Sequence, residues 1–375
     1  MSDTNMELIS TISEDNKLEL NLREIDIPEP GENDVIIRIE AAPINPSDLG
    51  VMFSAADMTT AKQSGSTESP VITADVPAKF MGAVKKRVGK AIPVGNEGAG
   101  IVIAAGSSAA AQSLMGKTVA FIGGGSYRKY LRANVQSCLE LEPGTTPVEA
   151  ASSFVNPLTS LAMVETMRAE GHKAIVHAAA ASNLGQMLNR ICIADGIDLV
   201  NIVRKPEQEK LLRDQGAKYV VNSSSDSFMA DLTQALIETG ATIAFDPIGG
   251  GKLASDILTC MEVAVSRDIT EYSVYGSTIF KQVYIYGGLD RGPITLNRTF
   301  GFAWGVNGFL LFNALGKLGQ ETVVAMRKRV AAEIKTTFAS HYTHEVSLAG
   351  ALKLESMAVY GKQATGEKFL IKPQS

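Results

Sequence analysis

A run of small residues between two apolar segments is the feature of this chain that points most directly to chemistry. Residues 173–185 end in Ala178-Ala-Ala-Ala-Ser-Asn-Leu-Gly185, and residues 198–205 form a second apolar segment that ends in Arg204 and Lys205. The pattern predicts a strand, a tight turn, a helix that begins near Ser182 or Asn183, and a second strand. Such a turn lets the backbone approach a pyrophosphate, and the helix start directs N–H groups at it. The segment therefore predicts a dinucleotide site and, with it, hydride transfer.

The turn is an incomplete match to the glycine pattern of dinucleotide-binding proteins. Alanines occupy the places of the first two glycines, and only Gly185 keeps the place that allows close packing of helix against strand. The alternative is an alanine-rich turn before an ordinary core helix. Arg204 and Lys205 favour NADP(H), because a 2'-phosphate needs a cation where a free ribose hydroxyl would need Asp or Glu. The alternative for this pair is a solvated helix start.

The elements that would position these residues show two different sequence patterns, one in each half of the chain. Short alternating segments such as residues 34–40, separated by Pro and Gly, predict a mostly β domain over residues 1–150. Residues 151–318 alternate strands with helices, which predicts a Rossmann-type doubly wound parallel sheet and an α/β fold class. The predicted strands of this second domain are residues 173–177, 198–203, 218–221, 241–246, 261–265 and 282–287.

A ligand of such a sheet binds outside the carboxyl ends of the strands, where several loop residues would converge. These residues are Ala178, Arg204, Asn222, Pro247 and Gly287. Residues 319–375 contain an amphipathic helix and a last strand at 368–372, and we expect them to complete the first domain. Residues 55–90, rich in Ser, Thr and Lys, predict a long loop that is either a functional lid or a solvated excursion. The glycine-aromatic stretch 300–312 also stands outside the pattern.

Composition restricts the classes of function. The chain has 375 residues, 45% hydrophobic and 20% charged, with a formal net charge of −5. This predicts two folded domains and no nucleic-acid partner, because binding to phosphates needs a basic surface. No apolar run would span a bilayer and no export signal begins the sequence, so we expect a cytoplasmic protein without a membrane partner. The three cysteines lie far apart among apolar neighbours and predict reduced, buried thiols.

Several co-linear motifs resemble those of one enzyme superfamily. The motifs are Ala42-Pro-Ile-Asn-Pro-Ser-Asp-Leu49, Val94-Gly-Asn-Glu-Gly-Ala-Gly-Ile-Val102 and Val155-Asn-Pro-Leu-Thr159. They are similar to motifs of zinc-free medium-chain dehydrogenases/reductases, in particular quinone oxidoreductases and 2-enoyl thioester reductases. The resemblance covers nearly the whole chain, and residues 182–186 and 200–204 lean toward the enoyl reductases. It implies a mostly β, partly open barrel catalytic domain beside the cofactor domain, and a homodimer joined through the cofactor domains.

The resemblance also bears on metal binding. Zinc-containing members carry Cys and His at the positions that Asn45 and Asn96 occupy here, and an amide is a poor zinc ligand. We therefore predict no metal. Glu97 is a possible ion ligand, but backbone N–H groups more often satisfy a carboxylate in such a turn.

The same resemblance implies roles for particular residues. Asn45 is expected to lie near the nicotinamide. Asn156 and Thr159 are expected close to the nicotinamide or its phosphate, and the backbone of the turn at residues 180–184 is expected to contact the pyrophosphate. The complete predicted cofactor set is Asn45, Asn156, Thr159, Ala180, Ala181, Ser182, Asn183, Leu184, Arg204, Lys205, Asn222, Pro247, Tyr286, Gly287 and Gly288. Turn capping is the alternative for Asn45 and Asn156, and cross-strand packing is the alternative for Tyr286.

One departure concerns proton delivery. Enoyl thioester reductases carry a proton-donating tyrosine a few residues after the first motif, but residues 49–57 contain no tyrosine. Tyr127 is a candidate replacement and, with Asn45, a candidate catalytic residue; its alternative is a packing role in a strand. Proton delivery from water is the simpler account, and quinone reduction permits it. His177, at the end of the first strand of the second domain, is expected to be buried and neutral.

Without a metal, hydrogen-bond donors must polarise the acceptor, which favours activated substrates. We predict an NADPH-dependent, zinc-independent oxidoreductase that transfers hydride to a small electrophile, a quinone or an α,β-unsaturated carbonyl compound. One alternative is a trans-2-enoyl thioester reductase. An alternative of another class is a nucleotide-binding structural or regulatory protein without turnover, which the missing tyrosine allows.

Overall fold

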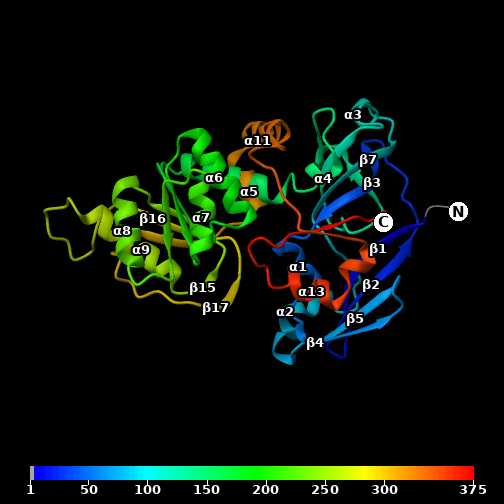
Figure 1. Ribbon diagram of the computed structural model, residues 1–375, viewed down its shortest axis with the longest axis horizontal. Coiled ribbons are helices and arrows are strands. Elements are labelled where there is room, and N and C mark those ends of the chain that lie inside the picture. The colour runs from blue at the N-terminus through cyan, green and yellow to red at the C-terminus, as the bar shows by residue number, and fades with distance from the viewer. Residues whose placement is uncertain (1–3) are drawn as a thin grey trace. The chain divides into compact units, whose positions relative to one another are not determined.

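The computed structural model describes residues 4–375 and divides into two compact units (Figure 1). The first unit runs to Val155 and includes Arg329–Ser375, and the second comprises Asn156–Lys328. Helix α5 (Val155–Ala169) begins at the first division, and α11 (Gln320–Glu333) contains the second.

Two open, mostly antiparallel sheets form the first unit. One sheet has five strands in the order β4-β5-β2-β1-β6; the other has seven, in the order β10-β8-β7-β3-β20-β19 with β9 beside β3. The strands are β1 (Asn5–Ile12), β2 (Lys17–Ile25), β3 (Asp34–Pro43), β4 (Asp57–Gly65), β5 (Pro70–Asp75), β6 (Ile92–Pro93), β7 (Glu97–Ala105), β8 (Thr118–Ile122), β9 (Tyr130–Asn134), β10 (Cys138–Glu140), β19 (His344–Val346) and β20 (Phe369–Ile371). Alternate residues of these strands, among them Leu18, Leu20 and Ile37, are fully buried in one core. The alternation of apolar and polar residues thus produces the predicted β unit.

The helices of this unit are short. They are α1 (Pro46–Met52), α2 (Met81–Val84), α3 (Ala109–Ser113), α4 (Pro147–Ala150), α12 (Leu348–Ala351) and α13 (Leu354–Tyr360), with single 3-10 turns at Ala78–Phe80, Lys85–Arg87 and Val135–Ser137. Strand β20 pairs antiparallel with β3, so the C-terminal segment completes the sheet that begins near the N-terminus.

Residues 55–90 are not the loop that their composition predicts. Strands β4 and β5 pair with each other, and β5 pairs with β2, so that Ile72 and Ala74 are buried in the core. Arg87 fastens the end of the segment, because its guanidinium donates to the backbone oxygen of Val51 at 3.0 Å and to the Ser10 hydroxyl at 2.8 Å. The exposed face of the hairpin carries the Ser, Thr and Lys side chains that obscured the strand pattern.

The second unit contains a parallel sheet in the order β13-β12-β11-β14-β16-β18. Its strands are β11 (Ile175–His177), β12 (Leu199–Val203), β13 (Tyr219–Asn222), β14 (Ile243–Asp246), β16 (Lys281–Ile285) and β18 (Trp304–Gly308), and β15 (Gly249–Gly251) pairs with β17 (Asp290–Ile294). Besides α5, its helices are α6 (Asn183–Asp195), α7 (Pro206–Asp214), α8 (Phe228–Thr239), α9 (Leu253–Ser266) and α10 (Leu311–Leu318). The strand order doubles back at β11, which confirms the predicted α/β, doubly wound fold class.

One predicted strand in this unit is wrong, and one strand was not predicted. Residues 261–265 form the end of α9 rather than a strand, because they continue a helical stripe in which Ile257, Leu258 and Met261 are buried while Val263 is 53% exposed. The sixth strand is instead β18, which lies in the glycine-aromatic stretch and pairs in parallel with β16. The three cysteines are free and buried, as predicted.

Candidate functional site

The turn between β11 and α6, residues 178–185, is the predicted phosphate-binding turn. Ser182 caps α6 through its hydroxyl, which accepts the N–H of Gly185 at 3.2 Å, and Ala180 and Ala181 are buried. A Cβ on Gly185 would lie 2.2 Å from the carbonyl oxygen of Ala180, so only glycine allows the helix to start this close to the turn. The first N–H groups of a helix have no acceptor within the helix, and they bind anions well.

Parallel strands bring the other predicted loop residues to the same edge of the sheet. Arg204, Asn222, Pro247 and Tyr286 directly follow or end β12, β13, β14 and β16. The order of the strands reverses between β11 and β14, and ligands of doubly wound sheets bind at such a point. Gly287 is also confined, since a Cβ there would lie 2.6 Å from the carbonyl oxygen of Pro247.

The two predicted cations differ in their surroundings. Arg204 is exposed at the end of β12, and its backbone N–H donates to the side chain of Gln208 at 3.1 Å. The Lys205 ammonium lies 3.7 Å from the Glu207 carboxylate at the start of α7. An incoming phosphate therefore competes with a carboxylate for Lys205, and Arg204 is the better candidate for the 2'-phosphate.

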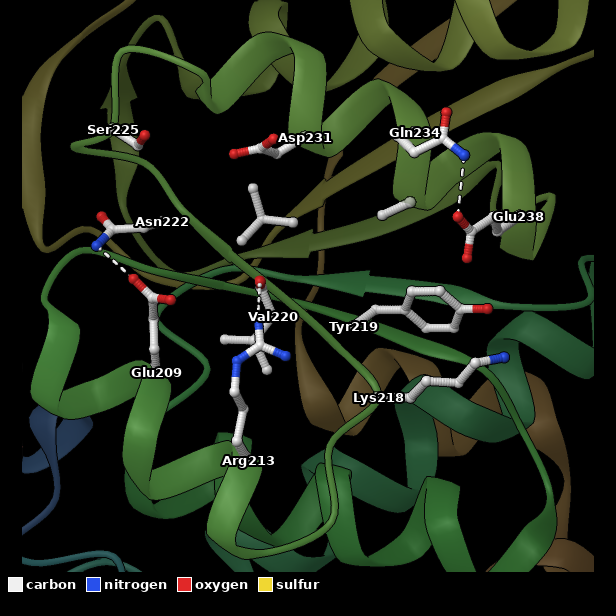
Figure 2. Close-up of a pocket in the computed structure, with 12 residues that line it drawn as sticks. Glu209, Arg213, Lys218, Tyr219, Val220, Asn222, Ser225, Asp231, Gln234 and Glu238 are labelled. Carbon is white, nitrogen blue, oxygen red and sulfur yellow. Dashed lines mark hydrogen bonds between the residues drawn. The ribbon is translucent and has the colours of Figure 1, made fainter.

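Asn222 already has partners in the protein. Its amide donates to Glu209 at 2.7 Å, and its side-chain oxygen accepts the N–H of Ser224 at 2.9 Å. It lies at one end of a groove along the sheet edge between α7, β13 and α8 (Figure 2). The residues that line this groove include none of residues 178–185, so the groove is separate from the phosphate-binding turn.

A histidine–tyrosine pair lies beside the turn. The Nε2 atom of fully buried His177 lies 2.8 Å from the Tyr286 hydroxyl, and the two rings stack with centroids 5.9 Å apart. Burial lowers the pKa of His177 to about 3, so the imidazole is neutral, as predicted. This contact engages the Tyr286 hydroxyl, and a role of Tyr286 in binding the cofactor stays a prediction.

Asn156 and Thr159 lie in the first turns of α5 and are almost fully buried. Ser160, next to them, donates to the backbone oxygen of Asn156 at 2.8 Å and approaches that of Leu184 at 3.3 Å. This contact holds the start of α5 beside the start of α6. It keeps Asn156 and Thr159 near the phosphate-binding turn, and their contacts with a cofactor stay predictions.

The first unit contains a second cluster of predicted residues, centred on Asn45. Asn45 precedes α1, and its backbone N–H donates to the Asp48 carboxylate at 2.7 Å. Its side-chain amide donates to Glu97 Oε1 at 2.8 Å. The other oxygen of Glu97 accepts the backbone N–H groups of Phe154 at 2.8 Å and Val155 at 3.0 Å. Glu97 thus accepts three N–H groups, from Asn45, Phe154 and Val155.

Burial perturbs the charged groups around this cluster. It raises the pKa of Asp48 to about 7 and raises that of Glu97, and it lowers the pKa of Lys368 to about 8. The charge of Lys368 in turn favours ionised Glu97. The Lys368 ammonium donates to the Ser152 hydroxyl at 2.9 Å. Our sequence interpretation did not include Lys368, whose only signal is a lone cation directly before an apolar strand.

The structure does not support Tyr127 as a proton donor. Tyr127 is fully buried, and its hydroxyl donates to the backbone oxygen of Pro43 at 3.0 Å. Burial and the nearby Asp48 carboxylate raise the pKa of its phenol well above the ordinary value. The packing alternative therefore describes Tyr127 better than the catalytic prediction.

Neither a metal-binding cluster nor a membrane-spanning helix occurs among residues 4–375. Residues 4–375 contain no group of three or more His, Cys, Asp or Glu side chains placed to hold a metal ion. Over the same residues, no helix combines the length and apolar character needed to cross a bilayer.

Comparisons with known proteins give the chain its relatives. No family model matches it. The mitochondrial enoyl-[acyl-carrier-protein] reductase of Xenopus tropicalis is 26% identical over 288 residues, which cover 74% of this chain and 68% of that enzyme. A solved structure from Mesorhizobium loti, assigned as an NADPH:quinone reductase, is 25% identical with a TM-score of 0.73, over 100% of this chain and 99% of the other. A mutant enoyl thioester reductase from Candida tropicalis shares the fold, with a TM-score of 0.66 and 20% identity over 99% and 100% of the two chains.

These matches confirm the resemblance to the medium-chain dehydrogenases/reductases. Within that superfamily, the likeness is to quinone and enoyl thioester reductases, as the motifs predicted. The full-length match to a medium-chain reductase fold also explains why a mostly β unit accompanies the parallel-sheet unit.

Proposed function

We propose that this chain is an NADPH-dependent oxidoreductase that reduces a quinone or an α,β-unsaturated carbonyl compound. The observation that carries the proposal is the turn at residues 178–185, where Ser182 caps α6 and Gly185 lets the helix start close to the turn. The relatives are reductases, and one is assigned NADPH as its reductant, which bears out the prediction of an oxidoreductase that uses NADP(H).

The residues of the second unit divide the binding of the cofactor between them. Ala180, Ala181, Ser182, Asn183 and Leu184 would hold the pyrophosphate, and Arg204, with Lys205, would hold the 2'-phosphate. Asn156, Thr159, Asn222, Pro247, Tyr286, Gly287 and Gly288 complete the proposed set, together with Asn45 from the first unit. When bound, NADPH supplies the hydride. The chain's own task is to orient the cofactor and exclude water, since a quinone or enone spreads the incoming charge onto its oxygen.

A trans-2-enoyl thioester reductase is the second candidate, because the curated relative named above is an enoyl thioester reductase by name. Tyr127, the tyrosine that the sequence offered as the acid, is fully buried, which favours the quinone. Steady-state reduction of a simple quinone and of a crotonyl thioester, followed by loss of NADPH absorbance, separates the two. A fall in absorbance with either substrate but not in buffer excludes the alternative of a nucleotide-binding protein without turnover.

Three further properties belong to the proposal. Zinc independence is tested by metal analysis and by activity after chelation, which we expect to be unchanged. A homodimer is supported by the edge strand β18, next to which Phe302, Leu310 and Phe312 are each more than half exposed. Light scattering of wild type and Phe312→Asp tests it, with dissociation expected in the variant. A cytoplasmic location is tested by cell fractionation, which matters because the enoyl reductase named above is mitochondrial.

A further inference from the structure

Residues 76–95 combine positive charge with apolar character and contain nothing else. Every residue of this stretch is a cation, an apolar residue, glycine or proline, although the whole chain has a net charge of −5. The cations are Lys79, Lys85, Lys86, Arg87 and Lys90. A run of cations and apolar residues without acidic, hydroxyl or amide side chains is typical of segments that lie on a membrane surface.

The fold divides this stretch between the core and the surface. It contains α2, which Figure 1 shows at the edge of the first unit. Met81, Val84 and Val88 pack against the core of that unit. Arg87 is used internally, because its guanidinium donates to the backbone oxygen of Val51 at 3.0 Å. The segment is therefore held in place by the protein itself, and its remaining cations are available at the surface.

The exposed face of residues 78–90, here called the basic face, presents the four lysines. Its other exposed residues are Ala78, Phe80, Gly82, Ala83 and Gly89. Phe80 is 44% exposed, and the Lys79 ammonium lies 5.0 Å from the centre of its ring. Within residues 4–375, none of the four lysines forms an ion pair with a carboxylate. The basic face thus surrounds an exposed aromatic ring with positive charges that have no partner in the chain.

This combination selects the class of partner. Lysine side chains bind anionic headgroups, and an aromatic ring inserts at the boundary between headgroups and acyl chains. Lysine is depleted from protein–protein interfaces, so a face whose only polar side chains are lysines fits a bilayer better than a protein. We propose that the basic face docks on the anionic surface of a lipid bilayer. This revises our expectation of no membrane partner, which considered only a segment that spans the bilayer.

The docking also narrows the class of substrate, a step that rests on the proposed function. A reductase held at a bilayer meets acceptors that dissolve there, so the substrate is a lipophilic quinone. The basic face is joined to α1 by the bond from Arg87 to Val51, and α1 begins directly after Asn45. A helix of this length spans about 10 Å, so the basic face lies within the first unit near the residue expected to act at the nicotinamide.

The test measures sedimentation of the full chain with lipid vesicles. One set of vesicles is phosphatidylcholine alone, and the other is equal parts phosphatidylcholine and phosphatidylglycerol. We expect binding to the second set only, and added salt should weaken it because salt screens the lysine charges. Lys85→Gln/Lys86→Gln should bind about 30-fold more weakly, which corresponds to ~1 kcal/mol for each lysine near an anionic surface.

Two further variants complete the design. Lys210→Gln/Lys252→Gln is the matched control, since it makes the same change of charge in the second unit, where these side chains are 76% and 82% exposed. It should bind vesicles as wild type does. Phe80→Trp reports on insertion: anionic vesicles with brominated acyl chains should quench its fluorescence more than that of wild type, whose only tryptophan is Trp304.

Three results would overturn the docking. Equal binding to both sets of vesicles would exclude recognition of anionic lipid, and wild-type binding by folded Lys85→Gln/Lys86→Gln would exclude the basic face. Binding to polyaspartate but to neither set of vesicles would make the partner an acidic protein.

Turnover separates the docking from the proposed function. Wild type should reduce an isoprenoid quinone in anionic vesicles and a water-soluble quinone, and Lys85→Gln/Lys86→Gln should be impaired only with the first. Reduction of the water-soluble quinone alone would refute the substrate class while the proposed function holds. If neither quinone is reduced by wild type that binds the vesicles, the proposed function fails and the docking stands.

Discussion

Replacement of Gly185 by alanine tests the phosphate-binding turn most directly. The added Cβ would lie 2.2 Å from the carbonyl oxygen, 2.6 Å from the carbonyl carbon and 2.8 Å from the Cα of Ala180. All three are backbone atoms, so no side chain can rotate to relieve the overlap. A non-bonded carbon and oxygen must stay roughly 3.2 Å or more apart in a close-packed interior. The start of α6 and the turn must therefore move apart by about 1 Å to accommodate the new methyl group.

A displacement of this size moves the N–H groups at the start of α6 away from a pyrophosphate that the same backbone must contact. Hydrogen bonds to a charged group contribute about 1.5–3 kcal/mol each, so the loss of one or two predicts NADPH binding weaker by roughly 10- to 10⁴-fold. Calorimetric titration measures the effect, and thermal unfolding shows how much of it is general destabilisation.

Gly316→Ala is the matched control in the same unit, since Gly316 lies in α10 and a Cβ there meets nothing within 4 Å. Alanine in the middle of a helix is favourable by up to about 1 kcal/mol, so the control should be slightly more stable and bind NADPH normally. Unchanged affinity in folded Gly185→Ala would show that the cofactor does not lie on this turn.

Three further predictions concern charge. Arg204→Ala should weaken NADPH binding about 10- to 100-fold and NADH binding less than about twofold, because only NADPH carries the 2'-phosphate. If titrations show that the variant loses affinity for NADPH and NADH equally, Arg204 does not bind the 2'-phosphate. The raised pKa of Asp48, about 7, means that the folded state binds more protons than the unfolded state between its ordinary pKa of 3.8 and 7. The unfolding free energy should therefore fall with rising pH across that window, by on the order of 4 kcal/mol, relative to Asp48→Asn; parallel urea-denaturation profiles would contradict this. Lys281→Met should lower the unfolding free energy by about 3–5 kcal/mol in urea denaturation, because it leaves the buried carboxylate of Glu262 without its cation. A loss below about 1 kcal/mol would argue against a stabilising ion pair between Lys281 and Glu262.

Much of the fold follows from local patterns in the sequence. Strands β11, β12, β13, β14 and β16 overlap the predicted segments, because each is an apolar run of typical strand length followed by a turn. The same reasoning failed at residues 261–265, where an apolar run of strand length belongs to a helix that began eight residues earlier at Leu253. It also missed β18, because glycines and aromatic residues gave no alternation, and its pairing with β16 depends on the tertiary structure.

The candidate site also has one part that local sequence patterns predict and one part that they do not. The turn and the start of α6 could be predicted because they depend on residues close together in the sequence: a small-residue turn, the Ser182 cap and Gly185 three positions later. The chemistry of Asn45 could not. Its amide donates to Glu97, which also accepts two backbone N–H groups more than 50 residues further on and interacts with the charge of Lys368 near the C-terminus. Each of these residues alone is compatible with a structural role. Only the folded chain brings them together around one buried carboxylate, so no pattern of neighbouring residues could reveal how the Asn45 amide is bound.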